Sequence, residues 1–292
     1  MGSVTTAELG QKSPLAAVGG NSRFLWLKVT LVAGLVVALY FRVLPGMALD
    51  WWNDPGSSHG MLIPPFALYL AWMRRSLTLA EPAVPDARGI WLTLLACLML
   101  IVGILGAEFF LTRASFVVLL AGLIWTFWGP GRFRTLLFPL VLLLTMIPLP
   151  QIIYNLLAAP LQLFASEVAT ELVQALGVAV YRDGNVIHLA GISLGVAEAC
   201  SGLRSLSSLV TASLLVGFLQ CTRIRTRILI VALSVPVAIG MNVVRVAGTA
   251  LIAEHNQEYA LGYYHSFSGW LVFLVGFGIV ALAAKILHAW ME

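Results

Sequence analysis

Cys200, Arg245 and His265 are the residues of this chain whose types are best suited to covalent chemistry. Each lies near an end of a strongly apolar segment, and the three ends are expected to share one side of a membrane. A thiolate is a nucleophile, a guanidinium can stabilise a developing oxyanion, and an imidazole can transfer a proton near neutral pH. Together these groups are the components of a cysteine acyl-transfer site.

Neighbouring residues would support that chemistry. Cys200 is expected to open a helix, whose positive dipole end lowers the pKa of a thiol. Arg204, four residues later, would place a cation on the same face, and the small Ser201 leaves the approach uncrowded. Asn242 precedes Arg245 by three residues, so it is expected to share a helical face with the guanidinium and orient it.

Each of these residues also has a plainer explanation. A cysteine at a helix start, or a histidine at a membrane interface, is structural more often than catalytic. An arginine within a membrane is costly and is functional by default, although Arg245 could instead pair with Glu254 or Glu198 and hold helices together. His255 is a rival to His265 as the proton carrier, but it does not stand at the start of a span.

The remaining cysteines and histidines do not suggest a second site. Cys221 follows Cys200 by 21 residues on one predicted helix, about 31 Å away, whereas a disulfide needs Cα atoms within roughly 7 Å. Cys97 lies within another span, so Cys200 is expected to be an unpaired thiol. His59, before Gly60, is interpreted as a cap or interface residue. No H-x-x-x-H or C-x-x-C spacing occurs, and neither a metal nor another cofactor is expected.

The composition indicates a membrane protein. Hydrophobic residues make up 60% of the 292 residues and charged residues only 10%, against about 25% charged residues in soluble domains. The mean hydropathy is +0.94. The apolar runs are continuous, unlike the alternating strands of a membrane β-barrel. The sequence therefore predicts an all-α polytopic membrane protein.

Eight transmembrane helices are expected from the apolar runs. Residues 1–22 are polar and predict a flexible cytoplasmic tail, and residues 23–292 predict one integral membrane domain. The expected spans are 24–41, 60–73, 90–106, 111–128, 135–150, 201–220, 228–252 and 267–287.

An extracytoplasmic insertion of about residues 151–199 is expected between the fifth and sixth spans. Ile152–Leu176 has apolar residues at helical spacing and is interpreted as an interfacial amphipathic helix. Asp183-Gly184 between β-forming residues predicts a hairpin, and a third short strand over Ile192–Val196 leads towards Cys200. This small sheet is expected to lie on the bilayer as a lid.

The basic residues predict the orientation, because positive loops face the cytoplasm. With both termini inside, the candidate site faces the exterior. The net charge of +4 is then explained by topology, and no basic face with interleaved aromatic residues suggests nucleic-acid binding. The arginine clusters assigned to cytoplasmic loops are Arg74/Arg75/Arg88, Arg132/Arg134 and Arg223/Arg225/Arg227.

Several blocks of this sequence, in this order, resemble the exosortase and archaeosortase family. The resemblance covers about residues 40 to 270, and the combination of blocks is more specific than any one of them. The blocks are Ser58–Pro64, which is similar to the N-terminal signature of the family, then Ala199–Ser205, Asn242–Arg245, and His265 with Gly269.

The resemblance implies a multi-pass enzyme of the bacterial inner membrane, a cysteine peptidase or transpeptidase with its active site on the periplasmic face. The catalytic Cys, Arg and His of the family map onto Cys200, Arg245 and His265. Expected substrates are exported proteins with a C-terminal tripartite sorting signal: a Pro-Glu-Pro-type motif, a transmembrane helix and a basic cluster. Such proteins are typical of bacteria that make exopolysaccharide. The acceptor of the acyl group is open among water, a glycan and a lipid.

The main alternative is a transporter or assembly subunit of an exopolysaccharide export system. Arg245 and His265 would then line a polar pathway and Cys200 would be a bystander. Against this alternative, few acidic residues lie within the apolar segments to couple ion movement. A purely structural scaffold is a third possibility, and it has no use for an unpaired external thiol.

Overall fold

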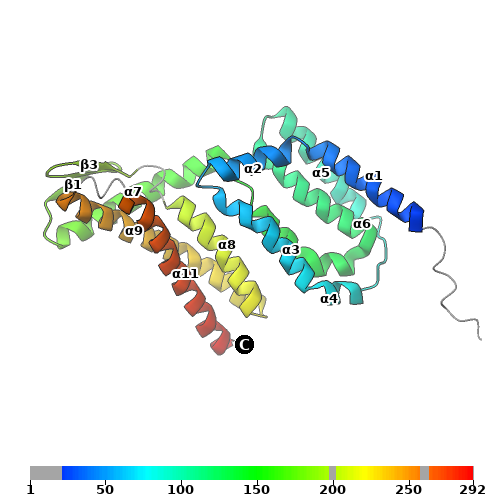
Figure 1. Cartoon of the computed structure of the whole chain (residues 1–292). Coiled ribbons are helices and arrows are strands. Elements are labelled where there is room, and N and C mark those ends of the chain that lie inside the picture. The colour runs from blue at the N-terminus through cyan, green and yellow to red at the C-terminus, as the bar shows by residue number, and fades with distance from the viewer. Residues whose placement is uncertain (1–21, 197–201, 257–262, 292) are drawn as a thin grey trace, which may run out of the picture. The chain divides into compact units, whose positions relative to one another are not determined.

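The computed structural model describes residues 22–196, 202–256 and 263–291, and most of them are helical (Figure 1). The chain forms two compact units, Met1–Pro45 and Gly46–Glu292. The first unit contains α1 (Ser22–Tyr40) and the first residues of α2 (Val43–Asn53). The helices of the second unit after α2 are the 3₁₀ helix η2 (Ser58–Leu62), α3 (Ile63–Met73), α4 (Arg75–Ala80), α5 (Gly89–Leu105), α6 (Phe109–Leu144), α7 (Gln151–Ala175), α8 (Leu203–Gln220), α9 (Ile224–His255) and α11 (Tyr263–Met291).

The helical membrane class is confirmed, but the expected number of spans is not. Among the described residues, five helices are long and apolar enough to cross a membrane: α6, α7, α8, α9 and most of α11. A sixth span results if the α1–α2 pair counts as one. Helices α3 and α5 have only 11 and 17 residues, fewer than the roughly 20 that a span needs. The expected total of eight is therefore not supported.

Helix α6 consists of two helical segments that meet at Gly129, and they correspond to the expected spans 111–128 and 135–150. The chain folds back at this residue, because Arg113 near the start of α6 contacts Asp50 and Met146 just after its end contacts Trp51. The backbone of Gly129 has φ 82° and ψ 176°. A Cβ at this position would lie 2.2 Å from the carbonyl oxygen of Val84, so only glycine fits. Pro130 follows and has no N–H to continue the hydrogen-bond pattern. A sharp reversal of the chain at Gly129 thus lies beside the loop predicted between these two spans.

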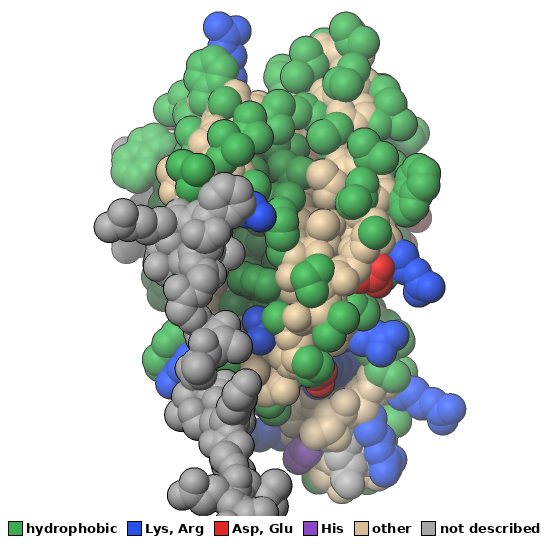
Figure 2. Space-filling model, turned by 90° about the vertical axis from the view of Figure 1, so that its right-hand side faces the viewer, with side chains coloured by type: hydrophobic (Ala, Val, Ile, Leu, Met, Phe, Trp, Pro, Cys, Tyr) green, Lys and Arg blue, Asp and Glu red, His purple; other side chains and the backbone are tan. Residues whose placement is uncertain are grey.

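Large hydrophobic side chains remain exposed along most helices, for example Trp91, Leu98 and Leu105 of α5. Hydrophobic side chains cover much of the face shown in Figure 2, and most of its Lys and Arg side chains lie in the lower half. Extensive exposed apolar surface marks a membrane or partner interface. This distribution agrees with helices that face lipid.

The three strands form an antiparallel sheet in the order β1–β2–β3, within the ranges expected from the sequence. The strands are β1 (Val180–Asp183), β2 (Val186–Leu189) and β3 (Ser193–Gly195). Val180 pairs with Leu189, and Val186 pairs with Gly195. The expected interfacial helix is α7, which by length and apolarity also qualifies as a span. Figure 1 shows α7 running across α8 and α11 rather than along them.

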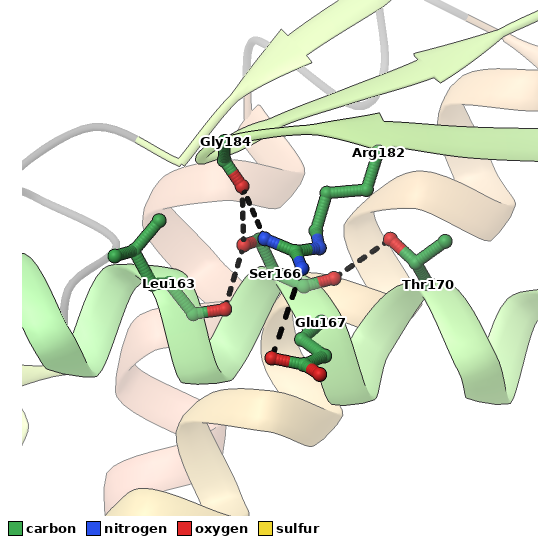
Figure 3. Close-up of polar contacts among 6 residues, drawn as sticks. All are labelled: Leu163, Ser166, Glu167, Thr170, Arg182 and Gly184. Carbon is green, nitrogen blue, oxygen red and sulfur yellow. Dashed lines mark hydrogen bonds and ion pairs between the residues drawn. The ribbon is translucent and has the colours of Figure 1, made fainter.

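Polar contacts attach the hairpin to α7 (Figure 3). The Ser166 hydroxyl of α7 lies 3.2 Å from the carbonyl oxygen of Gly184 in the hairpin turn. Arg182 of β1 donates from Nη1 to the same carbonyl oxygen at 2.8 Å. Its Nη2 lies 3.7 Å from the Glu167 carboxylate of α7. Two of these contacts hold the hairpin on α7, and the bond from Arg182 to Gly184 fixes the arginine within the hairpin.

A hydrophobic core lies beneath the sheet, between α7 and the last four turns of α9. It excludes water from the contact between the sheet and α9, so the sheet and that part of α9 form one packed body. Its buried members include Ala165, Ala169 and Val173 of α7, Val180, Ile187 and Leu189 of the sheet, and Val243, Val246, Ala247 and Ala250 of α9.

Candidate functional site between α8, α9 and α11

Helices α8, α9 and α11 pack together and position the candidate site. Small side chains allow close approach of membrane helices, and hydroxyl groups can join them by hydrogen bonds. The Ser213 hydroxyl of α8 donates to that of Ser234 of α9 at 3.3 Å, and both are buried. The apolar core of this bundle comprises Leu209, Val216, Cys221, Ile230, Ala238, Val280 and Ala284.

The start of α8 lies directly against α9. Gly202 caps α8 with a left-handed backbone, φ 78°. A Cβ at this position would lie 2.7 Å from Cγ and 2.9 Å from Nδ2 of Asn242. These distances are below any normal contact, so the backbone of Gly202 approaches Asn242 as closely as only glycine permits. The start of α8, two residues after Cys200 in the sequence, therefore meets α9 at Asn242.

Arg245, three residues after Asn242 on the same face of α9, meets α11. A Cβ at Gly269 of α11 would lie 3.4 Å from Arg245 Nη1. Asn242 and Arg245 are 3% and 7% exposed, respectively, and both have interaction partners. A buried guanidinium is costly unless it is satisfied. Two polar side chains, Asn242 and Arg245, are thus buried where α9 meets α8 and α11.

His265 is the third residue of α11, and the structure describes only its backbone. Position 265 lies four residues before Gly269, so the two share one helical face. Because Gly269 adjoins the Arg245 guanidinium, position 265 lies one turn further along the face that meets Arg245. Cys200 and Ser201 lie outside the described residues.

Arg204 lies in the first turn of α8 and is partly buried. Its Nε is buried without a hydrogen-bond partner in the described part of the chain. The expected pairing of Arg204 with Cys200 assumed that both belong to one helix. Since α8 begins only at Leu203, that i,i+4 relation does not hold, and the helix starts later than expected.

His59 lies in a different environment, formed by α2, the 54–57 turn and the end of α6. Its neighbour Gly60 packs against Trp51, which donates a hydrogen bond to the Met146 carbonyl oxygen. Burial lowers the pKa of the His59 imidazole, while the backbone at Thr145 and Gly56 and the Asp54 carboxylate oppose this shift. Nδ1 of His59 has no hydrogen-bond partner within the described segments.

The rival residues His255 and Glu254 lie away from the face of α9 that carries Asn242 and Arg245, or at the exposed end of that helix. His255 is exposed at the end of α9, with Nδ1 3.1 Å from the carbonyl oxygen of Leu251 in its own helix. Glu254 is exposed and follows Arg245 by nine residues, about 2.5 helical turns, which places it on the opposite face of α9. Glu198 lies outside the described residues. No cluster of potential metal ligands is found among the residues described.

Two features of the structure were not anticipated from the sequence. Arg113 of α6 is buried and forms an ion pair with Asp50 of α2, joining elements 63 residues apart. Arg74 and Arg227 approach the buried ring of Phe218. The sequence explained Arg74 and Arg227 by orientation alone and assigned no partner to Arg113, because a partner distant in the chain leaves no local pattern.

Comparison with known proteins gave one result. A family model described as transmembrane exosortase matches residues 51–282. The match runs from the end of α2 into the last third of α11, so it contains all the candidate site residues. No match was found among curated proteins or among solved structures.

Proposed function

The chain belongs to the transmembrane exosortase family, and on this premise we propose that it is a membrane-embedded cysteine peptidase or transpeptidase. Cys200 is the nucleophile, Arg245 stabilises the oxyanion and His265 transfers the proton. The substrate is an exported protein with a C-terminal sorting signal of the Pro-Glu-Pro, transmembrane helix and basic cluster type. Cleavage takes place at the periplasmic face of the bacterial inner membrane.

One observation carries the proposal: Gly202 against Asn242 and Gly269 against Arg245 bring three sequence blocks together. Cys200 precedes Gly202 by two residues, so their Cα atoms are at most about 7 Å apart. His265 precedes Gly269 by one helical turn. Each proposed catalytic residue is therefore within a short stretch of chain from a contact made by the same α9 face.

The proposed reaction is acyl transfer through a thioester. The Cys200 thiolate attacks the scissile carbonyl carbon, and the resulting oxyanion is stabilised by the Arg245 guanidinium. The C–N bond breaks, and the leaving amine takes a proton from the His265 imidazolium. The thioester is then attacked by water or an acceptor nucleophile, which gives its proton to the neutral His265 imidazole; the C–S bond breaks, and the Cys200 thiolate and the imidazolium are regenerated.

Burial of Arg245 favours this role over a solvated one. A guanidinium that is 7% exposed lies in a medium of low dielectric, where its interaction with a developing negative charge is much stronger than in water. Its position between α9 and α11 is fixed by packing, so little reorganisation is needed when the charge appears.

The proposal is tested by co-expressing the enzyme with a tagged substrate that carries the tripartite signal. Cys200→Ala and Arg245→Ala are expected to abolish processing, and His265→Ala to reduce it by about 10³-fold. Cys97→Ala, at a partly buried thiol of α5, is the matched control and is expected to process normally. Processing by Cys200→Ala would refute the mechanism. Cys200→Ser separates it from the transport alternative, in which that variant keeps full function.

A further inference from the structure

The ring of Phe218, in the last turn of α8, is a meeting point for three other elements. Phe218 is buried and stacks on Phe138 of α6, with ring centroids 3.6 Å apart and an interplanar angle of 3°. The guanidinium carbon of Arg74, just after α3, lies 4.3 Å from the centroid of the Phe218 ring. That of Arg227, in the first turn of α9, lies 4.9 Å away.

Hydrogen bonds hold both arginines in position. Arg74 donates from Nη1 to the Thr135 carbonyl oxygen of α6 at 3.3 Å. Arg227 donates from Nε and Nη2 to the Cys221 carbonyl oxygen at the end of α8, at 2.9 and 2.7 Å. A guanidinium has five N–H donors, so each arginine keeps donors that these bonds do not use. The cations are thus oriented in advance.

The positive charge at this ring is not balanced by a carboxylate within the described ranges. The ion pairs found there are Arg113–Asp50 and Arg182–Glu167, and neither involves Arg74 or Arg227. Burial, and then the positive charge of Arg227, lower the pKa of Arg74. Two guanidinium groups close enough to repel each other are stabilised by an anion that both can contact.

We propose that Arg74 and Arg227, supported by Phe218, bind the phosphate group of an anionic phospholipid. Arginine matches phosphate in a bidentate manner, and basic pockets between membrane helices recognise anionic headgroups. Leu219 and Leu137, next in sequence to the stacked rings, are exposed and provide apolar surface for acyl chains. This neighbouring surface favours a lipid over a free phosphate ion.

The lipid site and the candidate catalytic site lie at opposite ends of α8. This helix has 18 residues, which corresponds to about 27 Å. A lipid at the Phe218 end would fix α8 relative to α3, α6 and α9 without touching Gly202 or Arg245. The proposal is therefore independent of the function assigned to Cys200.

The test compares retention of phosphatidylglycerol and phosphatidylcholine by the purified full chain, measured by native mass spectrometry during detergent exchange. The wild type is expected to retain phosphatidylglycerol preferentially. Arg74→Gln with Arg227→Gln is expected to weaken phosphatidylglycerol binding by about thirtyfold, and Arg74→Gln alone by about fivefold. The single variant keeps the Arg227 bonds to Cys221 and so avoids loosening the end of α8.

Arg75→Gln is the matched control, because Arg75 is adjacent in sequence but lies over the Trp72 ring at 4.2 Å. It is expected to bind phosphatidylglycerol like the wild type, and Arg74→Lys to bind more weakly than the wild type but more tightly than Arg74→Gln, because lysine keeps the charge and loses the bidentate donors. Equal retention of the two lipids by the wild type would overturn the proposal. So would binding of inorganic phosphate as tight as that of phosphatidylglycerol, since this would show an anion site and not a lipid site.

Discussion

At the Gly202 end of the α8–α9 pair, Arg245 is buried between helices that approach each other through glycines. At the Phe218 end, Arg74 and Arg227 lie on an aromatic ring and stay partly exposed. The first arrangement fixes one cation in a dry, rigid place, as stabilisation of a transient charge requires. The second leaves two cations able to meet a ligand from outside. The same residue type therefore occupies two different environments, which match the two roles that we propose for it.

Gly202→Ala should give the largest effect, because it breaks the close contact of the Gly202 end. The left-handed backbone costs an alanine about 1–2 kcal/mol, and the overlap with Asn242 adds about 1–3 kcal/mol. We expect a loss of about 3 kcal/mol in stability, measured by denaturant unfolding in detergent. Gly217→Ala, nearer the Phe218 end of α8, is the control, since its Cβ would have no neighbour closer than 3.5 Å. Equal losses would remove the contrast between the two ends.

Substitution of arginine by lysine should lower substrate processing at the Gly202 end of α8 and leave it unchanged at the Phe218 end. Arg245→Lys removes the planar set of donors from a buried site, and we expect processing of the substrate to fall by about 10²-fold. Arg74→Lys keeps a positive charge at a partly exposed site, and we expect substrate processing to be unchanged. Assays of initial processing rates for both variants provide the measurement. Full activity of Arg245→Lys would show that Arg245 acts only as a charge.

Gly269→Ala should have a smaller effect on the Arg245 guanidinium. Its Cβ would lie 3.4 Å from Nη1, at the short limit of ordinary van der Waals contact, so even a small inward movement of the guanidinium would be blocked. Misplacement of a catalytic group lowers the rate, and we expect about a fivefold loss of kcat with little change in the substrate KM. Gly278→Ala on the same helix has open space and should match the wild type. Identical kinetics for both variants would exclude a positioning role for Gly269.

The smallest expected effect is a pH dependence of stability due to His59. Burial lowers its folded-state pKa below the ordinary value of 6.5, so below that pH the unfolded chain binds more protons than the folded one. Stability is therefore expected to be full above pH 6.5 and to fall as the pH decreases towards the folded-state pKa. Melting temperatures between pH 8 and 5 should show a smaller decline for His59→Gln than for the wild type. The same decline in both would assign it to other groups.

The sequence was sufficient for the helical class, because long apolar runs have few alternatives in a chain with so little charge. It also located the hairpin, since Asp183-Gly184 between β-forming residues has a specific turn geometry. It was insufficient for the number of spans. Hydropathy measures only the length of an apolar run, and it cannot show that α3 has only 11 residues.

The sequence was sufficient to predict which three blocks of residues form the candidate site. It was not sufficient to predict the distances and contacts between those blocks. Residue types indicate possible chemistry, whereas the contact of Gly202 with Asn242 depends on a distance across 40 positions of the chain. The expected start of the helix at Cys200 was wrong by a few residues, because the left-handed Gly202 delays it to Leu203. The pair Arg74 and Arg227 was missed because each arginine was already explained by the orientation rule.

The length of α9 has a consequence for what the enzyme can cut. Helix α9 continues for 13 residues past Asn242, from 242 to 255, or about 20 Å, and the sheet packs against that extension. Gly202, which adjoins Asn242, therefore lies about 20 Å along α9 from the end of that helix. An extended chain covers about 3.4 Å per residue, so the proposed cleavage near Gly202 would require about six unfolded residues between the globular part of a substrate and its scissile bond. Under this proposal, the length of α9 would select substrates by the length of that spacer.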